Sequence, residues 1–280
     1  MFKYRIISFP LLIALAAAVF IWEAGGKYLF TLLAVAGCGA MLFEAARLFD
    51  KIKIRNYPWL SAAAGALISA AYCAGKFHND STTWCSAVIL LLMTAAGIIS
   101  LLMMIGKKNK CVRKISGTVA VCLIFGLPFL LLEMIYFDTA SGFSQLLYII
   151  PVVKAMDTGG YIFGMLSARL LPGGNHKIAP SISPKKSWEG VIGGLLFSVG
   201  ASLIFYHFCG GSLLWYLING VMLGILSLFG DLTESSLKRS AEVKDSANWI
   251  PGMGGILDVF DSFLYVGYYY IAAKLLMNYF

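Results

Sequence analysis

The last hydrophilic segment, which runs from Ser235 to Asp261, carries charged side chains of both signs in a chain otherwise dominated by apolar residues. The residues that could do chemistry there are Lys238, Arg239, Lys244, Asp245, Asp258 and Asp261. Charges are costly near a bilayer, so a dense mixed cluster between apolar segments is by default a hypothesis of a functional site. The basic groups could hold phosphates, and the last two aspartates could hold a divalent metal ion. The combination indicates nucleotide or phosphoryl chemistry at a membrane.

The end of this segment combines a glycine-rich turn with paired carboxylates. The turn residues are Pro251, Gly252, Gly254 and Gly255. They predict a loop with exposed backbone N–H groups, a shape suited to phosphate. Asp258 and Asp261 follow about one turn apart at the expected start of the next helix, where one metal ion could bridge them. Paired carboxylates alone are a weak signal, because aspartate at a helix start also favours the helix dipole.

A second polar group begins where the preceding apolar run ends. Asp231 and Glu234 are three residues apart, as are Ser235 and Lys238, so one helical face could present all four. Burial of Asp231 beside the apolar run would be costly without a cation or a basic partner.

Two upstream segments contain further candidates. In the segment from Lys154 to Gly164, Asp157 lies inside an apolar stretch, and the adjacent Gly159 and Gly160 allow a ligand or a neighbouring helix to approach closely. A lone aspartate in such a stretch could also be structural.

The segment from Pro180 to Gly194 predicts an anion site at the start of a helix. Pro184 prevents a helix through the loop, and Ser187 is the predicted N-cap. The flanking side chains are Lys185, Lys186, Trp188 and Glu189. Two lysines beside a helix N-terminus favour anion binding. An interfacial anchor with a cap would explain Ser187 and Trp188, but it does not require both lysines and Glu189 together.

Composition identifies the elements that must position these residues as membrane helices. Hydrophobic residues make up 59% of the chain and charged residues 13%, and the mean hydropathy is +0.80. Soluble domains carry roughly 25% charged residues. About nine stretches are long enough to cross a bilayer: 6–22, 28–46, 58–75, 84–105, 115–137, 144–166, 189–208, 212–231 and 261–279. The sequence therefore predicts an all-α polytopic membrane protein.

The distribution of basic residues predicts the orientation of these helices. Most of the 22 lysines and arginines fall in alternate loops, on the side that also holds the N-terminus. Because cytoplasmic loops are enriched in basic residues, we expect the N-terminus and all the polar clusters to be cytoplasmic. The net charge of +8 follows from this topology, and we expect no nucleic-acid partner.

The chain separates into two regions of different character, 1–140 with transmembrane helices nearly free of chemistry and 141–280 with the polar clusters. Glu44 and Glu133 are the exceptions in the first region. A helix–helix hydrogen bond, or a side chain that extends to the membrane interface, is the simpler interpretation of both.

The polar motifs of the second region resemble those of the phosphatidate cytidylyltransferase (CDP-diacylglycerol synthase) family. The family signature looks like S-x-x-K-R-x-x-x-x-K-D-x-x-x-x-x-P-G-H-G-G-x-x-D-R-x-D. The chain matches it at Ser235, Lys238, Arg239, Lys244, Asp245, Pro251, Gly252, Gly254, Gly255, Asp258 and Asp261. The segments SPKKSWEG and DTGGY are similar to the family's as well, so the resemblance covers roughly residues 150–280.

The resemblance implies an enzyme that converts CTP and phosphatidate into CDP-diacylglycerol and pyrophosphate. Mg²⁺ would stabilise such a displacement, and our hypothesis assigns Asp231, Asp258 and Asp261 to metal binding, with Asp157 as a weaker candidate; a second cation is left open. The phosphate contacts would be Lys185, Lys186, Lys238, Arg239 and Lys244, with Asp245 as a supporting or metal-linked group. Substrate binding would also involve Ser187, Glu189, Gly252, Gly254 and Gly255. Such an enzyme would lie in the inner membrane with its active site facing the cytoplasm, and a homodimer is left open.

Two positions depart from the family pattern. Met253 stands where the family commonly has His, and Val259 where it commonly has Arg. If either group were obligatory, the chain would be an impaired homologue. The alternatives are a related CTP-dependent enzyme acting on another lipid phosphate or alcohol, a transporter, and a non-catalytic scaffold. A transporter should place polar residues in pseudo-symmetric helices at mid-span, which this sequence does not show.

Overall fold

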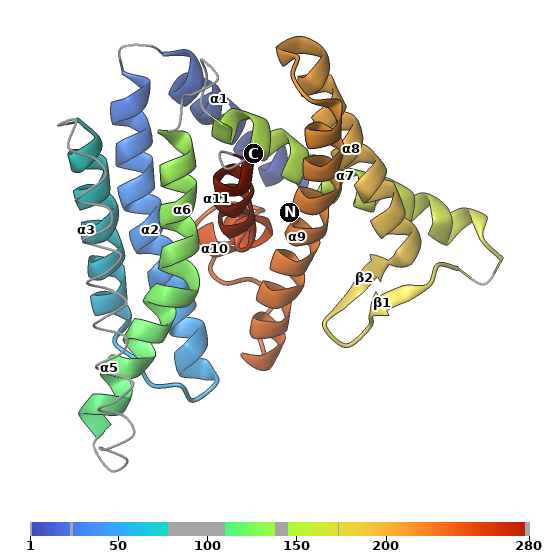
Figure 1. Cartoon of the computed structure of the whole chain (residues 1–280). Helices are drawn as coiled ribbons and strands as arrows, with labels where there is room; N and C mark the ends of the chain where they lie inside the picture. The colour runs from blue at the N-terminus through green and yellow to red at the C-terminus, as the bar shows by residue number, and fades with distance from the viewer. Residues whose placement is uncertain (1, 23–24, 78–109, 138–144, 173, 278–280) are drawn as a thin grey trace. The chain divides into compact units, whose positions relative to one another are not determined.

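The computed structural model describes residues 2–22, 25–77, 110–137, 145–172 and 174–277. Helices account for nearly all of the regular structure, as Figure 1 shows. The chain divides into two compact units, each described here by itself. The first comprises 1–137 and 240–259, and the second comprises 138–239 and 260–280.

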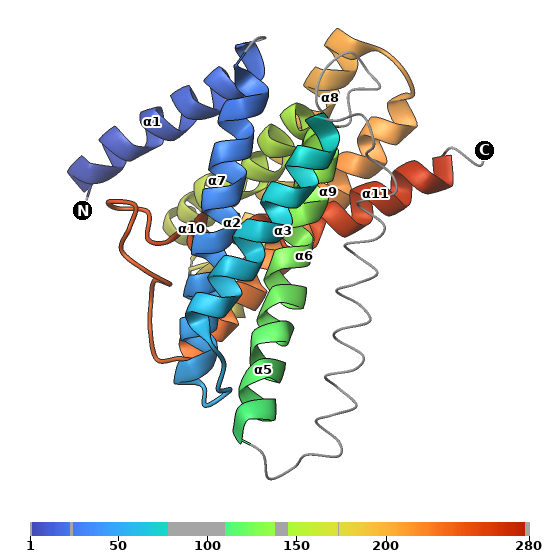
Figure 2. The same ribbon diagram turned by 90° about the vertical axis from the view of Figure 1, so that its left-hand side faces the viewer.

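The first unit is built from long apolar helices. They are α1 (Phe2–Ile21), α2 (Gly26–Lys51), α3 (Pro58–Phe77), α5 (Lys110–Val121) and α6 (Leu127–Tyr136), with a π-helical turn, η1 (Cys122–Gly126), between the last two. The turn precedes Pro128, which lacks the N–H that a regular helix would use there. Helices α2, α3 and α6 run side by side, as Figure 2 shows. The short α10 (Ile256–Phe260) begins in this unit and ends just beyond it.

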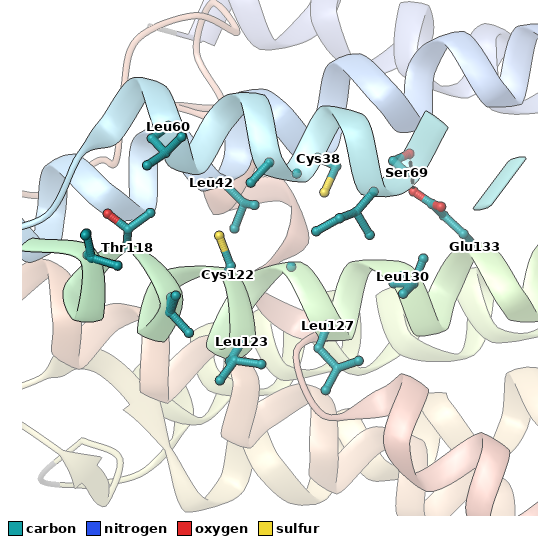
Figure 3. A pocket seen from close by; sticks show the side chains of 16 residues that line it. Cys38, Leu42, Leu60, Ser69, Thr118, Cys122, Leu123, Leu127, Leu130 and Glu133 are labelled. Atoms are coloured by element: carbon teal, nitrogen blue, oxygen red, sulfur yellow. Dashed lines mark hydrogen bonds between the residues drawn. The ribbon is translucent and has the colours of Figure 1, made fainter. Parts of the chain in front are cut away.

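A cavity of about 200 Å³ lies among α2, α3, α5, η1 and α6. Apolar side chains such as Leu42 and Leu130 line most of it, as Figure 3 shows. Its polar residues include Glu133, which accepts a hydrogen bond of 2.6 Å from the Ser69 hydroxyl. Because this bond joins α6 to α3, Glu133 fits the simpler interpretation, a helix–helix hydrogen bond.

The second unit contains three long helices and a small hairpin. Its elements are α7 (Gln145–Leu170), β1 (Lys177–Ala179), β2 (Ser183–Ser187), α8 (Trp188–Cys209), α9 (Leu213–Ser240, whose last residue belongs to the first unit), η2 (Asp261–Phe263) and α11 (Val266–Met277). The two strands are antiparallel and pair Lys177 with Ser187. The hairpin is the only pair of β-strands among the described residues.

Glycines let α7 and α8 pack closely. A Cβ atom on Gly159 would lie 2.6 Å from the carbonyl oxygen of Gly193, and one on Gly190 would lie 2.9 Å from that of Gly160. Small residues at such a crossing are typical of membrane helices. Of the two partners that the sequence allowed for Gly159 and Gly160, the structure shows a neighbouring helix.

Within the described residues, six helices are long and apolar enough to cross a membrane. They are α2, α3, the continuous run Lys110–Tyr136, α7, α8 and α9. Each overlaps a stretch predicted from the sequence, so the prediction of a polytopic helical membrane protein is confirmed. The apolar part of α1, Pro10–Ile21, is shorter, and the predicted span 84–105 lies outside the described residues.

The last predicted span, 261–279, differs from the structure. The chain there forms the 3₁₀ turn η2 and then α11, a helix of 12 residues. The Asp261 carboxylate accepts hydrogen bonds from both the N–H and the hydroxyl of Ser262. Local bonds of this kind compete with regular helix formation. The apolar pattern therefore extended the helix too far toward the polar loop.

Candidate functional site

The predicted site residues fall in both units. In the second unit, Asp231 of α9 forms an ion pair with Lys186 of β2, with Nζ 2.5 Å from Oδ2. The Ser235 hydroxyl donates to the other carboxylate oxygen at 3.2 Å. Both charged side chains are about one-quarter exposed or less. The structure thus supplies the basic partner that burial of Asp231 requires.

A buried serine, Ser262, connects a second set of charges. Its Oγ lies 2.8 Å from Asp261 Oδ1, 3.1 Å from Asp157 Oδ2 and 3.3 Å from Lys154 Nζ. Lys154 also forms an ion pair of 3.3 Å with Asp157. A hydroxyl has one proton, so Ser262 donates to one carboxylate at a time and accepts from the lysine. No role was predicted for Ser262, whose only signal was its position directly after Asp261.

The Asp261 carboxyl lies outside the membrane-spanning helices and has an unusual protonation equilibrium. Burial raises its pKa to about 7, and the nearby charges of Asp231 and Asp157 act in the same direction. Lys154 and the Ser262 hydroxyl oppose the shift. The surrounding positive charge is thus too weak to stabilise the ionised carboxylate, and a bound cation would stabilise it.

Asp231 and Asp261 offer carboxylate oxygens of the kind that Mg²⁺ binds. Throughout the described ranges, no group of three or more His, Cys, Asp or Glu side chains is arranged to hold a metal ion. Mg²⁺ is commonly bound by one or two carboxylates together with substrate phosphates and water. Asp231 and Asp261, whose charges repel each other, match that donor set.

The remaining basic residues of the second unit have different surroundings. Lys238 is nearly buried and pairs with the fully buried Glu234, with Nζ 2.5 Å from Oε2. Arg239 donates from Nε to the carbonyl oxygen of Ile182 at 3.2 Å, which holds the turn of the hairpin. Lys185 is exposed. Lys185 and Arg239 are therefore more accessible to a solvated phosphate than Lys238.

The start of α8 is built as the sequence predicts. Ser187 is the N-cap and accepts a hydrogen bond of 3.2 Å from the N–H of Gly190. Glu189 accepts from His176, both from Nδ1 at 2.6 Å and from the backbone N–H at 3.2 Å. Glu189 therefore closes the base of the hairpin, an arrangement that keeps β2 and its lysines next to the helix N-terminus.

In the first unit, the glycine-rich segment forms a tight turn. The Met253 N–H donates to the carbonyl oxygen of Ile250 at 3.0 Å, and Gly252 has a φ of +79°. Pro251 before such a glycine is typical of a type II turn. Gly254, with a φ of +97°, donates to the same carbonyl oxygen at 3.1 Å. The predicted loop is confirmed.

Asp258 is held by the loop that precedes it. Its Oδ2 accepts hydrogen bonds from the N–H of Gly255 at 2.7 Å and from the N–H and hydroxyl of Ser246 at 2.9 and 2.8 Å. The N–H groups of residues 253, 254 and 255 are thus all used inside the loop. The expectation that these groups stand free for phosphate is wrong, because the turn and Asp258 occupy them.

Glu44 of α2 is the residue of this region that sequence reasoning missed. Its side chain is buried and accepts hydrogen bonds from the N–H groups of Ile256 and Leu257, each at 2.9 Å. Its Oε2 also lies 2.7 Å from the Ser246 hydroxyl, which donates its one proton to Glu44 or to Asp258 at a time. A buried acid in an apolar helix was a signal that a partner exists, but it did not identify the partner. Lys244 and Asp245, in the same loop, are exposed.

Comparison with known proteins yields one family. The model of the cytidylyltransferase family matches residues 3–277. A phosphatidate cytidylyltransferase from Staphylococcus aureus (strain COL) is 36% identical over 225 residues, which are 78% of this chain and 79% of the relative. One from Staphylococcus saprophyticus is 36% identical over 223 residues with the same shares. One from Haemophilus influenzae is 41% identical over 145 residues, about half the length of each chain.

Proposed function

This chain belongs to the cytidylyltransferase family, and we infer that it transfers the cytidylyl group of CTP to phosphatidate, giving CDP-diacylglycerol and pyrophosphate. The observation that carries this function is the match of the family model to residues 3–277. The relatives named phosphatidate cytidylyltransferase agree with it. The geometry agrees with it, because carboxylates and lysines gather in a membrane protein as phosphate chemistry requires.

The reaction asks for positioning and charge neutralisation more than for acid–base chemistry. A phosphate oxygen of phosphatidate is already an anionic nucleophile. It forms a bond to the α-phosphorus of CTP while the bond from that phosphorus to the bridging oxygen breaks, and pyrophosphate leaves. Displacements of this kind are accelerated by aligned groups and by stabilisation of the phosphoryl charge.

We assign Asp231 and Asp261 as the residues that would hold Mg²⁺, because their mutual repulsion and the partly buried position of Asp261 favour a cation. Asp258 and Asp157 are supporting candidates, the former from its place in the signature. Mg²⁺ bound there would supply neutralisation of the charge on the phosphates. A second cation is not required by the proposal.

The lysines have separate roles in this proposal. Lys186 balances Asp231 and would be available to contact a phosphate if a cation were bound to that carboxylate. Lys185 and Lys244 are exposed and contact phosphates directly, while Asp245 supports Lys244. Lys238 acts through its ion pair with Glu234, and Arg239 through the hairpin turn that it holds. Ser187 and Glu189 fix the start of α8, and Gly252, Gly254 and Gly255 shape the loop that holds Asp258.

The proposed topology has about nine spans, a cytoplasmic N-terminus and an active site facing the cytoplasm from the inner membrane. The asymmetric distribution of lysine and arginine supports it. CTP reaches the site from the cytoplasm, and phosphatidate reaches it from the bilayer. No nucleic acid is involved.

The test is a transfer assay with the purified full-length protein, radiolabelled CTP, phosphatidate vesicles and Mg²⁺. We expect label in the lipid phase, none after chelation by EDTA, and a rate reduced about 100-fold or more in Asp261→Asn. The matched control is Glu242→Gln, which changes an exposed carboxylate of the same hydrophilic segment.

Two results would overturn the assignment. One is the absence of lipid-soluble label with phosphatidate in both Mg²⁺ and Mn²⁺. The other is more rapid labelling of a lipid alcohol than of phosphatidate, which would identify the related class of CTP-dependent lipid enzyme.

A further inference from the structure

We propose that Glu44 is a positioning residue for the catalytic loop: its carboxylate fixes the start of α10 and, through Ser246, the orientation of Asp258. The inference rests on the proposed function and deepens it, because it gives a residue of α2, in the region that the sequence left without chemistry, a role in holding the loop that carries Asp258. All of the contacts that carry it lie within the first unit.

The Glu44 carboxylate is hydrogen-bonded to the backbone at the start of α10. Its two oxygens accept from two consecutive amides, Ile256 N at Oε1 and Leu257 N at Oε2, each at 2.9 Å. These amides belong to the first turn of α10, where a helix leaves N–H groups without partners of its own. The glutamate is 1% exposed, so water does not compete for these bonds. Two bonds to adjacent amides fix the direction of the chain as well as its position.

The side chain of Ser246 connects Glu44 to Asp258. The Ser246 hydroxyl lies 2.7 Å from Glu44 Oε2 and 2.8 Å from Asp258 Oδ2. The N–H of Ser246 donates to Asp258 as well, at 2.9 Å. Because these donors and Gly255 converge on one oxygen of Asp258, the plane of that carboxylate is set by the loop that Glu44 holds.

The same contacts explain why the signature has a glycine at position 255. A Cβ atom on Gly255 would overlap both Glu44 Oε2 and Ser246 Oγ. The backbone is therefore bare at this point because the glutamate and the serine fill the space. Beside this cluster, the ring of Trp249 lies 6.2 Å from that of Phe43, the neighbour of Glu44, so the loop also packs on α2 through aromatic contact.

The same unit offers a matched control. Glu133 is as buried as Glu44, but its described hydrogen bonds come from Ser69 and Cys73, two side chains of α3. Glu133→Gln keeps an oxygen that can accept from Ser69. In Glu44→Gln, one of the two acceptor positions becomes an NH₂ group, and either orientation of the amide leaves Ile256 or Leu257 facing a donor. The two variants make the same change of side chain and differ in their effect on the loop.

The experiment compares Glu44→Gln, Glu133→Gln and the wild type by hydrogen exchange and by activity, all in detergent-solubilised full-length protein. We expect faster exchange at the amides of Ile256 and Leu257 in Glu44→Gln only. We also expect the Mg²⁺ concentration for half-maximal transfer to rise about 10–100-fold, the usual effect of losing an outer partner of a metal ligand. Ser246→Ala should show a smaller rise, because the two amide bonds to Glu44 remain.

The outcomes separate the two hypotheses. If the wild type makes no CDP-diacylglycerol, the proposed function fails, and the exchange measurement still decides whether Glu44 holds the loop. Wild-type exchange at both amides in Glu44→Gln would overturn the positioning role, as would an equal rise in the Mg²⁺ requirement in Glu133→Gln. If Glu44→Gln does not fold, an unchanged Mg²⁺ requirement in Ser246→Ala would overturn it instead.

Discussion

The carboxylates of the two units are satisfied in different ways. In the first unit, Glu44 and Asp258 accept hydrogen bonds from neutral donors, namely backbone N–H groups and a serine hydroxyl. In the second unit, Asp231 and Asp157 face lysines, and Asp231 raises the pKa of Asp261. Neutral donors fix a shape, whereas opposed charges leave a balance that a cation and phosphates can shift. The difference supports the proposal that the second unit binds the cation.

The largest expected effect comes from removing a charge in the second unit. Asp231→Asn removes one of the two carboxylates that we propose bind the cation, and it leaves Lys186 without its ion-pair partner. We expect kcat/KM to fall about 10²–10³-fold, the range for groups that stabilise charge in a transition state. Steady-state transfer rates at saturating Mg²⁺ measure it. If the neutral change Glu133→Gln in the first unit lowered kcat/KM as much, the contrast between the units would not hold.

The protonation of Asp261 provides a second test, made without divalent cations. The pKa of this carboxyl is about 7 in the folded protein and 3.8 in its ordinary state, so the folded form binds the proton more tightly. The contribution to stability is therefore present at low pH and is lost as pH rises from about 4 to 7. Thermal unfolding in EDTA should show this slope, and Asp261→Asn should reduce it. Added Mg²⁺ should restore stability near pH 7; a slope unchanged in Asp261→Asn would contradict the assignment.

The smallest expected effect concerns the packing of α7 against α8 in the second unit. In Gly159→Ala, the new methyl group would lie 2.6 Å from the Gly193 carbonyl oxygen, so α7 and α8 must separate. We expect a loss of about 1–3 kcal/mol in unfolding free energy. Gly200→Ala is the control on α8, because a Cβ there has no neighbouring atom within 4 Å. It should be neutral or stabilise the helix by up to about 1 kcal/mol. Equal effects on the melting temperature would show that the close crossing contributes nothing.

Much of this arrangement follows from local patterns in the sequence. Apolar length predicts the helices that run from α2 to α9 where the structure describes them, and the order Ser187 to Gly190 predicts a capped helix start. Pro251 and Gly252 predict their turn. The need of Asp231 for a basic partner is also readable, because an unpaired carboxylate in an apolar run is too costly.

The remainder depends on contacts between distant parts of the chain. Glu44 and Ser246 are 202 residues apart, and no periodicity connects them. The hairpin of β1 and β2 was not predicted, because strands of three and five residues with proline and lysine lack the alternating apolar pattern. Ser262 gives no signal either, since its role depends on which side chains surround it.

The separation between Glu44 and its partners also matters during synthesis. The ribosome delivers α2 long before Ser246, Ile256 and Leu257, so for most of translation the carboxylate has none of these donors. Placing it among apolar helices before they arrive would be costly. Closure of the first unit is therefore expected to wait for the final hydrophilic segment. A nascent chain released early would carry a buried carboxylate without hydrogen-bond donors among its apolar helices.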